Sequence, residues 1–125
     1  MLLNGIFCTD CVEFMKNMPE SSVDLTITSP PYDDLRDYNG YDFDYERIAR
    51  QLFRITKEGG VVVWVVGDKI VKGNKTLSSF KQALTFQKIG FNVHDTMIYK
   101  RRIPPSIMKK YYLIVFFYMF FYFLF

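Results

Sequence analysis

Short apolar runs alternate with amphipathic segments along most of the chain. Residues 23–28 and 61–66 are apolar runs with many β-branched side chains, which is typical of buried strands. Residues 44–57 and 76–88 place apolar side chains at helical spacing, and each segment leads into a glycine. Residues 91–99 then return to the spacing of a strand. The pattern therefore predicts strands and helices in alternation.

The N-terminal segment extends this alternation by one strand and one helix. Residues 2–8 are apolar enough for a short strand in which Cys8 is buried, and Asp10 is the expected N-cap of a helix that ends near Met18. The resulting order, β-α-β-α-β-α-β, predicts an α/β fold with a mostly parallel sheet and flanking helices. The uninterrupted apolar run at residues 61–66 predicts a strand that is buried on both faces.

The last segment, residues 111–125, contains no charged residue and is dominated by aromatic side chains. As a helix it would reach about 22 Å, short of the roughly 30 Å hydrocarbon core of a bilayer. Its aromatic and β-branched content favours a strand. We therefore expect residues 1–110 to form the main unit and residues 111–125 to form its terminal strand. A membrane-attached tail flanked by Lys109 and Lys110 is the alternative.

The strand at residues 23–28 leads into the turn Ser29-Pro30-Pro31-Tyr32. Pro31 keeps Pro30 out of the helical region, and neither proline has a backbone N–H, so the chain must leave the sheet here. The Ser29 hydroxyl and the Pro30 carbonyl are then two acceptors at a nearly fixed separation. They match the two N–H donors of a nucleobase amine, and Tyr32 can stack on the ring. An ordinary strand-ending turn is the other interpretation of this segment.

Charge is distributed unevenly along the chain, although the formal net charge is only +3. Residues 1–46 hold 2 basic and 10 acidic side chains, whereas residues 47–125 hold 14 basic and 3 acidic ones. Such a basic half is typical of a polyanion partner, most simply nucleic acid, or of a solvated basic face. Residues 69–75 are basic and predict a mobile loop. We expect DNA contacts from a second basic turn, which contains Lys100, Arg101 and Arg102.

The two cysteines and the single histidine exclude a tetrahedral zinc site, since Cys8, Cys11 and His94 supply too few ligands. A redox pair remains open, beside the simpler interpretation that Cys8 is a strand residue and Cys11 a helix-start residue. The sequence shows neither a secretory signal nor a sign of an oxidising compartment, so a cytoplasmic location is expected.

The chain resembles the amino-methylating DNA methyltransferases, which modify N4 of cytosine or N6 of adenine. Within them it is similar to the permuted group, in which the catalytic motif precedes the cofactor motif. The resemblance covers about residues 3–112. It is carried, in the family's order, by Asp10-Cys11, Ser22–Leu25, Thr28–Tyr32, Leu35–Tyr38, Lys57–Gly60, Trp64–Asp68, Ser79–Ala83 and Gly90–Asp95.

The resemblance implies a partial Rossmann-like methyltransferase domain that acts on double-stranded DNA, often beside a restriction enzyme. A base is flipped out, Ser29 and the Pro30 carbonyl hold its amine, and Tyr32 stacks on its ring. The methyl group comes directly from S-adenosylmethionine, so no cysteine nucleophile is needed. Ser at the first motif position favours cytosine N4 over adenine N6. Asp10 matches a position near the cofactor's adenine, and Asp68 lines the pocket or faces solvent.

One family feature has no match in this sequence, namely the Phe-x-Gly-x-Gly cofactor loop. The only Gly-Gly pair, Gly59-Gly60, is interpreted as a helix end. We therefore expect a methyltransferase domain truncated at its C-terminal side and inactive on its own. A second polypeptide would carry the cofactor loop, or the chain is a remnant without catalytic activity.

Overall fold

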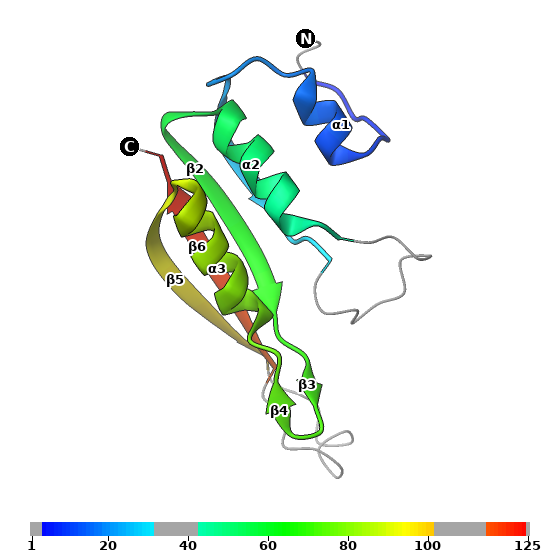
Figure 1. Ribbon diagram of the computed structural model, residues 1–125, viewed down its shortest axis with the longest axis vertical. Helices are drawn as coiled ribbons and strands as arrows, with labels where there is room; N and C mark the ends of the chain where they lie inside the picture. The colour runs from blue at the N-terminus through cyan, green and yellow to red at the C-terminus, as the bar shows by residue number, and fades with distance from the viewer. Residues whose placement is uncertain (1–3, 32–42, 102–114, 125) are drawn as a thin grey trace.

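The computed structural model describes residues 4–31, 43–101 and 115–124, and helices and strands alternate in these ranges (Figure 1). Their bounds are α1 Cys11–Lys16, β1 Val23–Thr28, α2 Tyr45–Ile55, β2 Thr56–Gly67, β3 Ile70–Val71, β4 Asn74–Lys75, α3 Ser78–Ile89, β5 Asn92–Arg101 and β6 Val115–Phe123. The predicted α/β fold is therefore confirmed.

Four strands form the main sheet in the order β1-β2-β6-β5. β1 and β2 pair in parallel, and β6 pairs antiparallel with both β2 and β5. Consequently β1, β2 and β5 run in one direction and β6 alone runs against them, so β1–β2 is a parallel pair and the two pairs made by β6 are antiparallel. The sheet is mixed because β6 is inserted between two strands of the opposite direction.

The aromatic C-terminal segment supplies the inserted strand β6. Val61 on β2 pairs with Phe123, and Asn92 on β5 pairs with the same residue from the other side. Both edges of β6 are thus hydrogen-bonded within the sheet. Within the described ranges, no helix has both the length and the apolar character needed to cross a membrane.

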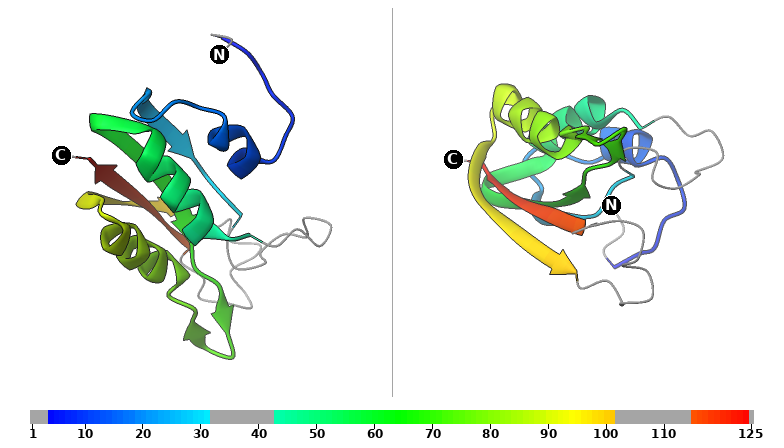
Figure 2. Two further views of the ribbon diagram at one scale, coloured as in Figure 1. Left: turned by 45° about the horizontal axis from the view of Figure 1, so that its top comes forward. Right: turned by 90° about the horizontal axis from the view of Figure 1, so that it is seen from below.

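The helices α1, α2 and α3 lie on one face of this sheet (Figure 2). Val62, Trp64 and Val66 on β2 point toward them and are at most 1% exposed. They form the core with side chains from α2 and α3, among them Leu52 and Phe86. Burying such large apolar side chains contributes roughly 2–3 kcal/mol each. The helix layer therefore packs against the side chains of β2.

The other face of the sheet has no covering helix among the described residues (Figure 2). On β1, Leu25 is 55% exposed and Ile27 is 68% exposed, although both are large and apolar. Val63, the partner of Ile27 on β2, is buried, whereas Val61 and Val65 are only half-buried. The predicted burial of residues 61–66 on both faces thus holds best at Val63.

Two of the predicted helix ends are confirmed, whereas the end at Gly59-Gly60 is wrong because α2 ends at Ile55 and both glycines lie in β2. The Asp10 side chain accepts hydrogen bonds from the backbone N–H groups of Val12 and Glu13, at 2.9 and 3.0 Å, and so caps α1. Gly90 ends α3, where its N–H donates to the carbonyl oxygens of Phe86 and Gln87. Both ends follow local rules of helix termination.

The predicted strand at residues 2–8 is wrong for the part that the structure describes. Residues 4–8 adopt no strand, and Cys8 is exposed rather than buried. A strand needs a neighbour to satisfy its backbone hydrogen bonds, and none of the described strands runs beside this segment.

The predicted mobile loop at residues 69–75 is also wrong. β3 and β4 form an antiparallel hairpin in which Ile70 pairs with Lys75 and Val71 with Asn74. The two residues between the strands, Lys72 and Gly73, have φ angles of 49° and 78°. Two successive left-handed residues form the tight turn that matches the twist of a hairpin. Gly73 therefore indicates a tight turn at this position and not a mobile loop.

Gly90 gives a test of this architecture. Its φ angle is 132°, and a Cβ atom there would lie 2.8 Å from the Phe53 ring. We expect Gly90→Ala to lower the free energy of unfolding by about 2–4 kcal/mol, measured by chemical denaturation.

Gly73→Ala is the matched control, because Gly73 also has a positive φ but a Cβ there would have no atom within 4 Å. Its loss should be only about 1 kcal/mol. Equal losses in the two variants would contradict the packing of Phe53 against the end of α3.

Candidate functional site

The turn that follows β1 lies at the carboxyl end of two parallel strands. Thr28, the last residue of β1, pairs with Trp64 on β2. Ser29 is exposed after it, Pro30 is buried and Pro31 is half-buried. Tyr32 lies outside the described residues.

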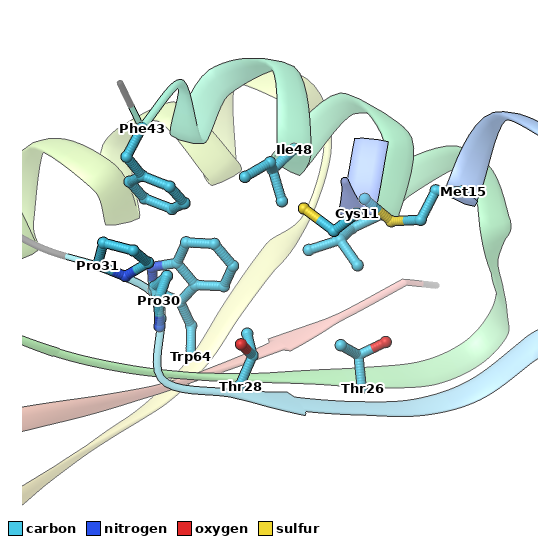
Figure 3. A pocket seen from close by; sticks show the side chains of 10 residues that line it. Cys11, Met15, Thr26, Thr28, Pro30, Pro31, Phe43, Ile48 and Trp64 are labelled. Carbon is cyan, nitrogen blue, oxygen red and sulfur yellow. The ribbon is translucent and has the colours of Figure 1, made fainter. Parts of the chain in front are cut away.

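A cavity of about 200 Å³ opens beside this turn (Figure 3). It lies between β1, the helices α1 and α2, and the segment that leads into α2. Its walls are mostly apolar. The residues that line it are Cys11, Met15, Thr26, Thr28, Pro30, Pro31, Phe43, Ile48, Leu52 and Trp64. Ligand sites of open α/β sheets are typically found at this end of the strands.

Trp64 forms the inner wall of the cavity and belongs equally to the core. Its Nε1 donates a hydrogen bond of 2.8 Å to Oε1 of Gln82 on α3, and both side chains are buried. The indole also packs against Phe86, with ring centroids 4.9 Å apart. On the cavity side it lies nearly parallel to Phe43, at 6.3 Å and 26°. The orientation of this aromatic wall is therefore fixed by packing.

A few polar groups reach this apolar space. Thr26 and Thr28 project into it from β1, and the Cys11 thiol approaches from α1 (Figure 3). Although Cys11 as a residue is exposed, partial burial of its thiol raises its pKa, and the carboxylate of Asp10 raises it further. The thiol therefore stays protonated at neutral pH and is a poor nucleophile.

The cavity has a small volume and aromatic side chains in its wall. Drug-sized ligands occupy pockets of about 300–1,000 Å³, larger than the space found here. Phe43 and Trp64 present flat faces to the cavity, and the Pro30–Pro31 backbone passes along its rim. Among the residues that the structure describes, no group of three His, Cys, Asp or Glu side chains could hold a metal ion.

The two predicted cofactor carboxylates have other interactions in this structure. Asp10 caps α1 next to Cys11, but it does not line the cavity. The Asp68 carboxylate accepts from Ser79 at the start of α3, at 2.8 Å from the backbone N–H and 2.9 Å from the hydroxyl. Asp68 thus bonds to the first turn of α3, whose N-cap residue Leu77 has a φ of 55° and makes no side-chain cap bond.

Two of the three predicted DNA-binding residues lie at the same end of the sheet. Lys100 and Arg101 are the last two residues of β5, whose carboxyl end points the same way as those of β1 and β2. Their side chains and Arg102 lie outside the described part. Sequence reasoning missed Phe43 and Trp64 as cavity residues. The available signal for Trp64 was its place on the strand that follows the Pro-Pro turn.

Comparison with known proteins gives consistent results. A family model described as DNA methylase matches residues 23–123. Over 86 residues the chain is 64% identical to the orphan methyltransferase M.BamHII of Bacillus amyloliquefaciens, and over 71 residues it is 35% identical to the type II methyltransferase M.BglII of Bacillus subtilis. These matches cover 69% and 52% of the chain.

Solved structures show the same architecture. The Thermus thermophilus protein TTHA0409, complexed with S-adenosyl-L-methionine, superimposes with a TM-score of 0.70 at 27% identity over 90% of the chain. The cytosine-N4-specific PvuII DNA methyltransferase has a TM-score of 0.71 over 93% of the chain, at 18% identity, and supports the fold alone.

The chain spans only part of each relative. The match covers 32% of M.BamHII and 20% of M.BglII. It covers 52% of the TTHA0409 chain and 47% of the PvuII enzyme. The residues that the family model matches, 23–123, include the turn after β1 and the strands that pair beside it.

Replacing Gln82 with Leu tests whether the Trp64 wall depends on its hydrogen bond. The change leaves the buried indole N–H without this acceptor, so the free energy of unfolding should fall by about 1–3 kcal/mol. Since Trp64 is the only tryptophan, its fluorescence reports directly on the cavity wall and should shift in the folded variant.

Gln87→Leu is the matched control, because it makes the same change at an exposed position of α3. We expect its stability and emission to stay near those of the parent. An unchanged Gln82→Leu variant would show that packing alone holds the indole.

Proposed function

This chain belongs to the family of DNA methylases, and we propose that it is the base-holding part of an S-adenosylmethionine-dependent DNA amino-methyltransferase. The family model spans residues 23–123, which include β1 and the Ser29-Pro30-Pro31-Tyr32 turn. The observation that carries the proposal is the cavity itself. Its rim is the Pro-Pro turn, and its walls include the aromatic rings of Phe43 and Trp64.

The turn supplies two acceptors for the amine of a flipped base. In the proposed complex the Ser29 hydroxyl and the Pro30 carbonyl accept the two N–H bonds, and Tyr32 stacks on the ring. Both acceptors also favour the positive charge that develops on the amine nitrogen during methylation. Pro31 contributes by keeping Pro30 extended, so that little reorganisation is needed when the base enters.

The target amine that we propose is N4 of cytosine, with N6 of adenine as the alternative. Serine at the first position of the turn favours cytosine within the resembled family. Either base must be flipped out, because its amine has to leave the duplex stack before it can reach the turn. Identification of the methylated nucleoside distinguishes the two targets.

The described residues do not by themselves fit the cofactor. S-adenosylmethionine supplies the methyl group in such enzymes, but it is larger than the 200 Å³ cavity. The carboxylates of Asp10 and Asp68, the proposed cofactor contacts, bond to the first turns of α1 and α3. We therefore assign this chain the acceptor side of the reaction, with residues 1–110 as its catalytic-motif half and residues 111–125 as its last strand.

A second polypeptide is proposed to supply the cofactor side. β1 is an edge strand, so one row of its backbone groups has no strand beside it in the described sheet. Leu25 and Ile27 are exposed on the face that lacks helices, next to this edge. The TTHA0409 chain is nearly twice as long as the part matched here. A partner strand and helix layer at this position would cover both features.

Calorimetric titration with S-adenosylmethionine tests this division. We expect no micromolar binding to the chain alone, and binding after addition of the part of M.BamHII that lies outside the match. Leu25→Lys combined with Ile27→Lys should abolish the gain, whereas Lys81→Ala on exposed α3 should not. Micromolar binding to the chain alone would contradict the proposal, and absence of binding in the mixture would favour a non-catalytic remnant.

Methyl transfer in the same mixture tests the roles of the turn. Tyr32→Ala removes the proposed base stacking, worth about 1–3 kcal/mol, and should lower the rate roughly 10- to 100-fold. Cys11→Ala should change it little, because direct transfer needs no thiol. Equal losses in the two variants would refute these roles. DNA with its target base already methylated is the substrate control.

A further inference from the structure

The β3–β4 hairpin is an ordered element that the cavity does not use. Beyond the two strand pairs, its base is closed by the backbone N–H of Thr76, which donates to the Lys69 carbonyl at 3.0 Å. The Lys69 N–H donates in turn to the Thr76 hydroxyl at 3.3 Å. With the tight turn at Lys72-Gly73, residues 69–76 form a short, well-defined ribbon.

This ribbon starts at the same end of the sheet as the Pro-Pro turn. It follows the carboxyl end of β2, and the turn follows the carboxyl end of β1, its parallel neighbour. Figure 1 shows the hairpin extending beyond that end of the sheet, away from the body of the helices. Any duplex that delivers a base to the turn must approach this end of the sheet, so the ribbon lies on its path.

The side chains of the ribbon combine positive charge with exposed apolar surface. Lys69, Lys72 and Lys75 lie along it, and no acidic residue occurs between Asp68 and Asp95. Ile70 and Val71 are 44% and 47% exposed. A two-stranded ribbon is marginally stable in water, and exposed apolar residues on it gain nothing without a partner.

We propose that the β3–β4 hairpin binds duplex DNA next to the flipped base. Its lysines contact phosphates, and Ile70 and Val71 enter the groove. The four residues from Lys69 to the turn span about 13 Å at roughly 3.3 Å each. That length exceeds the depth of the major groove, about 8.5 Å, and a two-stranded ribbon fits its width. The inference rests on the proposed function for the nature of the partner.

Salt dependence of DNA binding by the whole 125-residue chain tests the phosphate contacts. Anisotropy of a short labelled duplex gives the affinity at several salt concentrations. Each of Lys72→Ala and Lys75→Ala should make the slope of log K against log salt less negative by about 0.9. Lys88→Ala is the control, because it removes the same charge near the far end of α3 and should leave the slope unchanged.

Ile70→Ser and Val71→Ser test the groove contacts. We expect each to weaken duplex binding several-fold while the salt slope stays unchanged, with circular dichroism confirming that the chain remains folded. Hairpin variants that match the parent in affinity and slope would overturn the proposal, as would a parent chain that binds no duplex. Failure of the cofactor titration would not affect this result, because the anisotropy assay contains neither cofactor nor second polypeptide.

Discussion

The hydrogen bond between Trp64 and Gln82 joins the two parts of this molecule that matter most, its core and its cavity. The indole lies on β2, donates a hydrogen bond to α3 and faces the cavity with its other side. The position of this cavity wall therefore depends on the position of α3. A buried polar group is held in one orientation because loss of its hydrogen bond costs free energy. The wall that Trp64 forms is therefore held as rigidly as the core and does not depend on a surface loop.

Local periodicity predicted the elements that have local causes. The strand that ends at Thr28, the helices α2 and α3, and the caps at Asp10 and Gly90 all follow from residues close in sequence. One failure is local, because the hairpin at residues 69–75 pairs Ile70 with Lys75 only five positions later. Two further failures involve partners that are distant. Residues 4–8 have strand composition but no neighbouring strand among those described, and Asp68 caps a helix through Ser79, eleven positions later. Periodicity carries no information about such pairings.

The candidate site divides in the same way. Its turn was predictable, because two prolines after a strand restrict the backbone wherever they occur. Its walls were not, since Phe43, Cys11 and Trp64 come from three separate segments that only the fold brings together. Side chains at the end of one parallel strand meet those of the next only once their register is known, here Thr28 opposite Trp64.

The central position of β6 has a consequence for biosynthesis. Of the four strands in this sheet, β6 follows the other three in the chain, although it lies between β2 and β5. Until β6 is in place, β2 and β5 cannot be joined, and each has a free edge able to pair with another nascent chain. Pairing across so long a sequence separation is also slow. Aggregation therefore competes with formation of this sheet until β6 has been inserted.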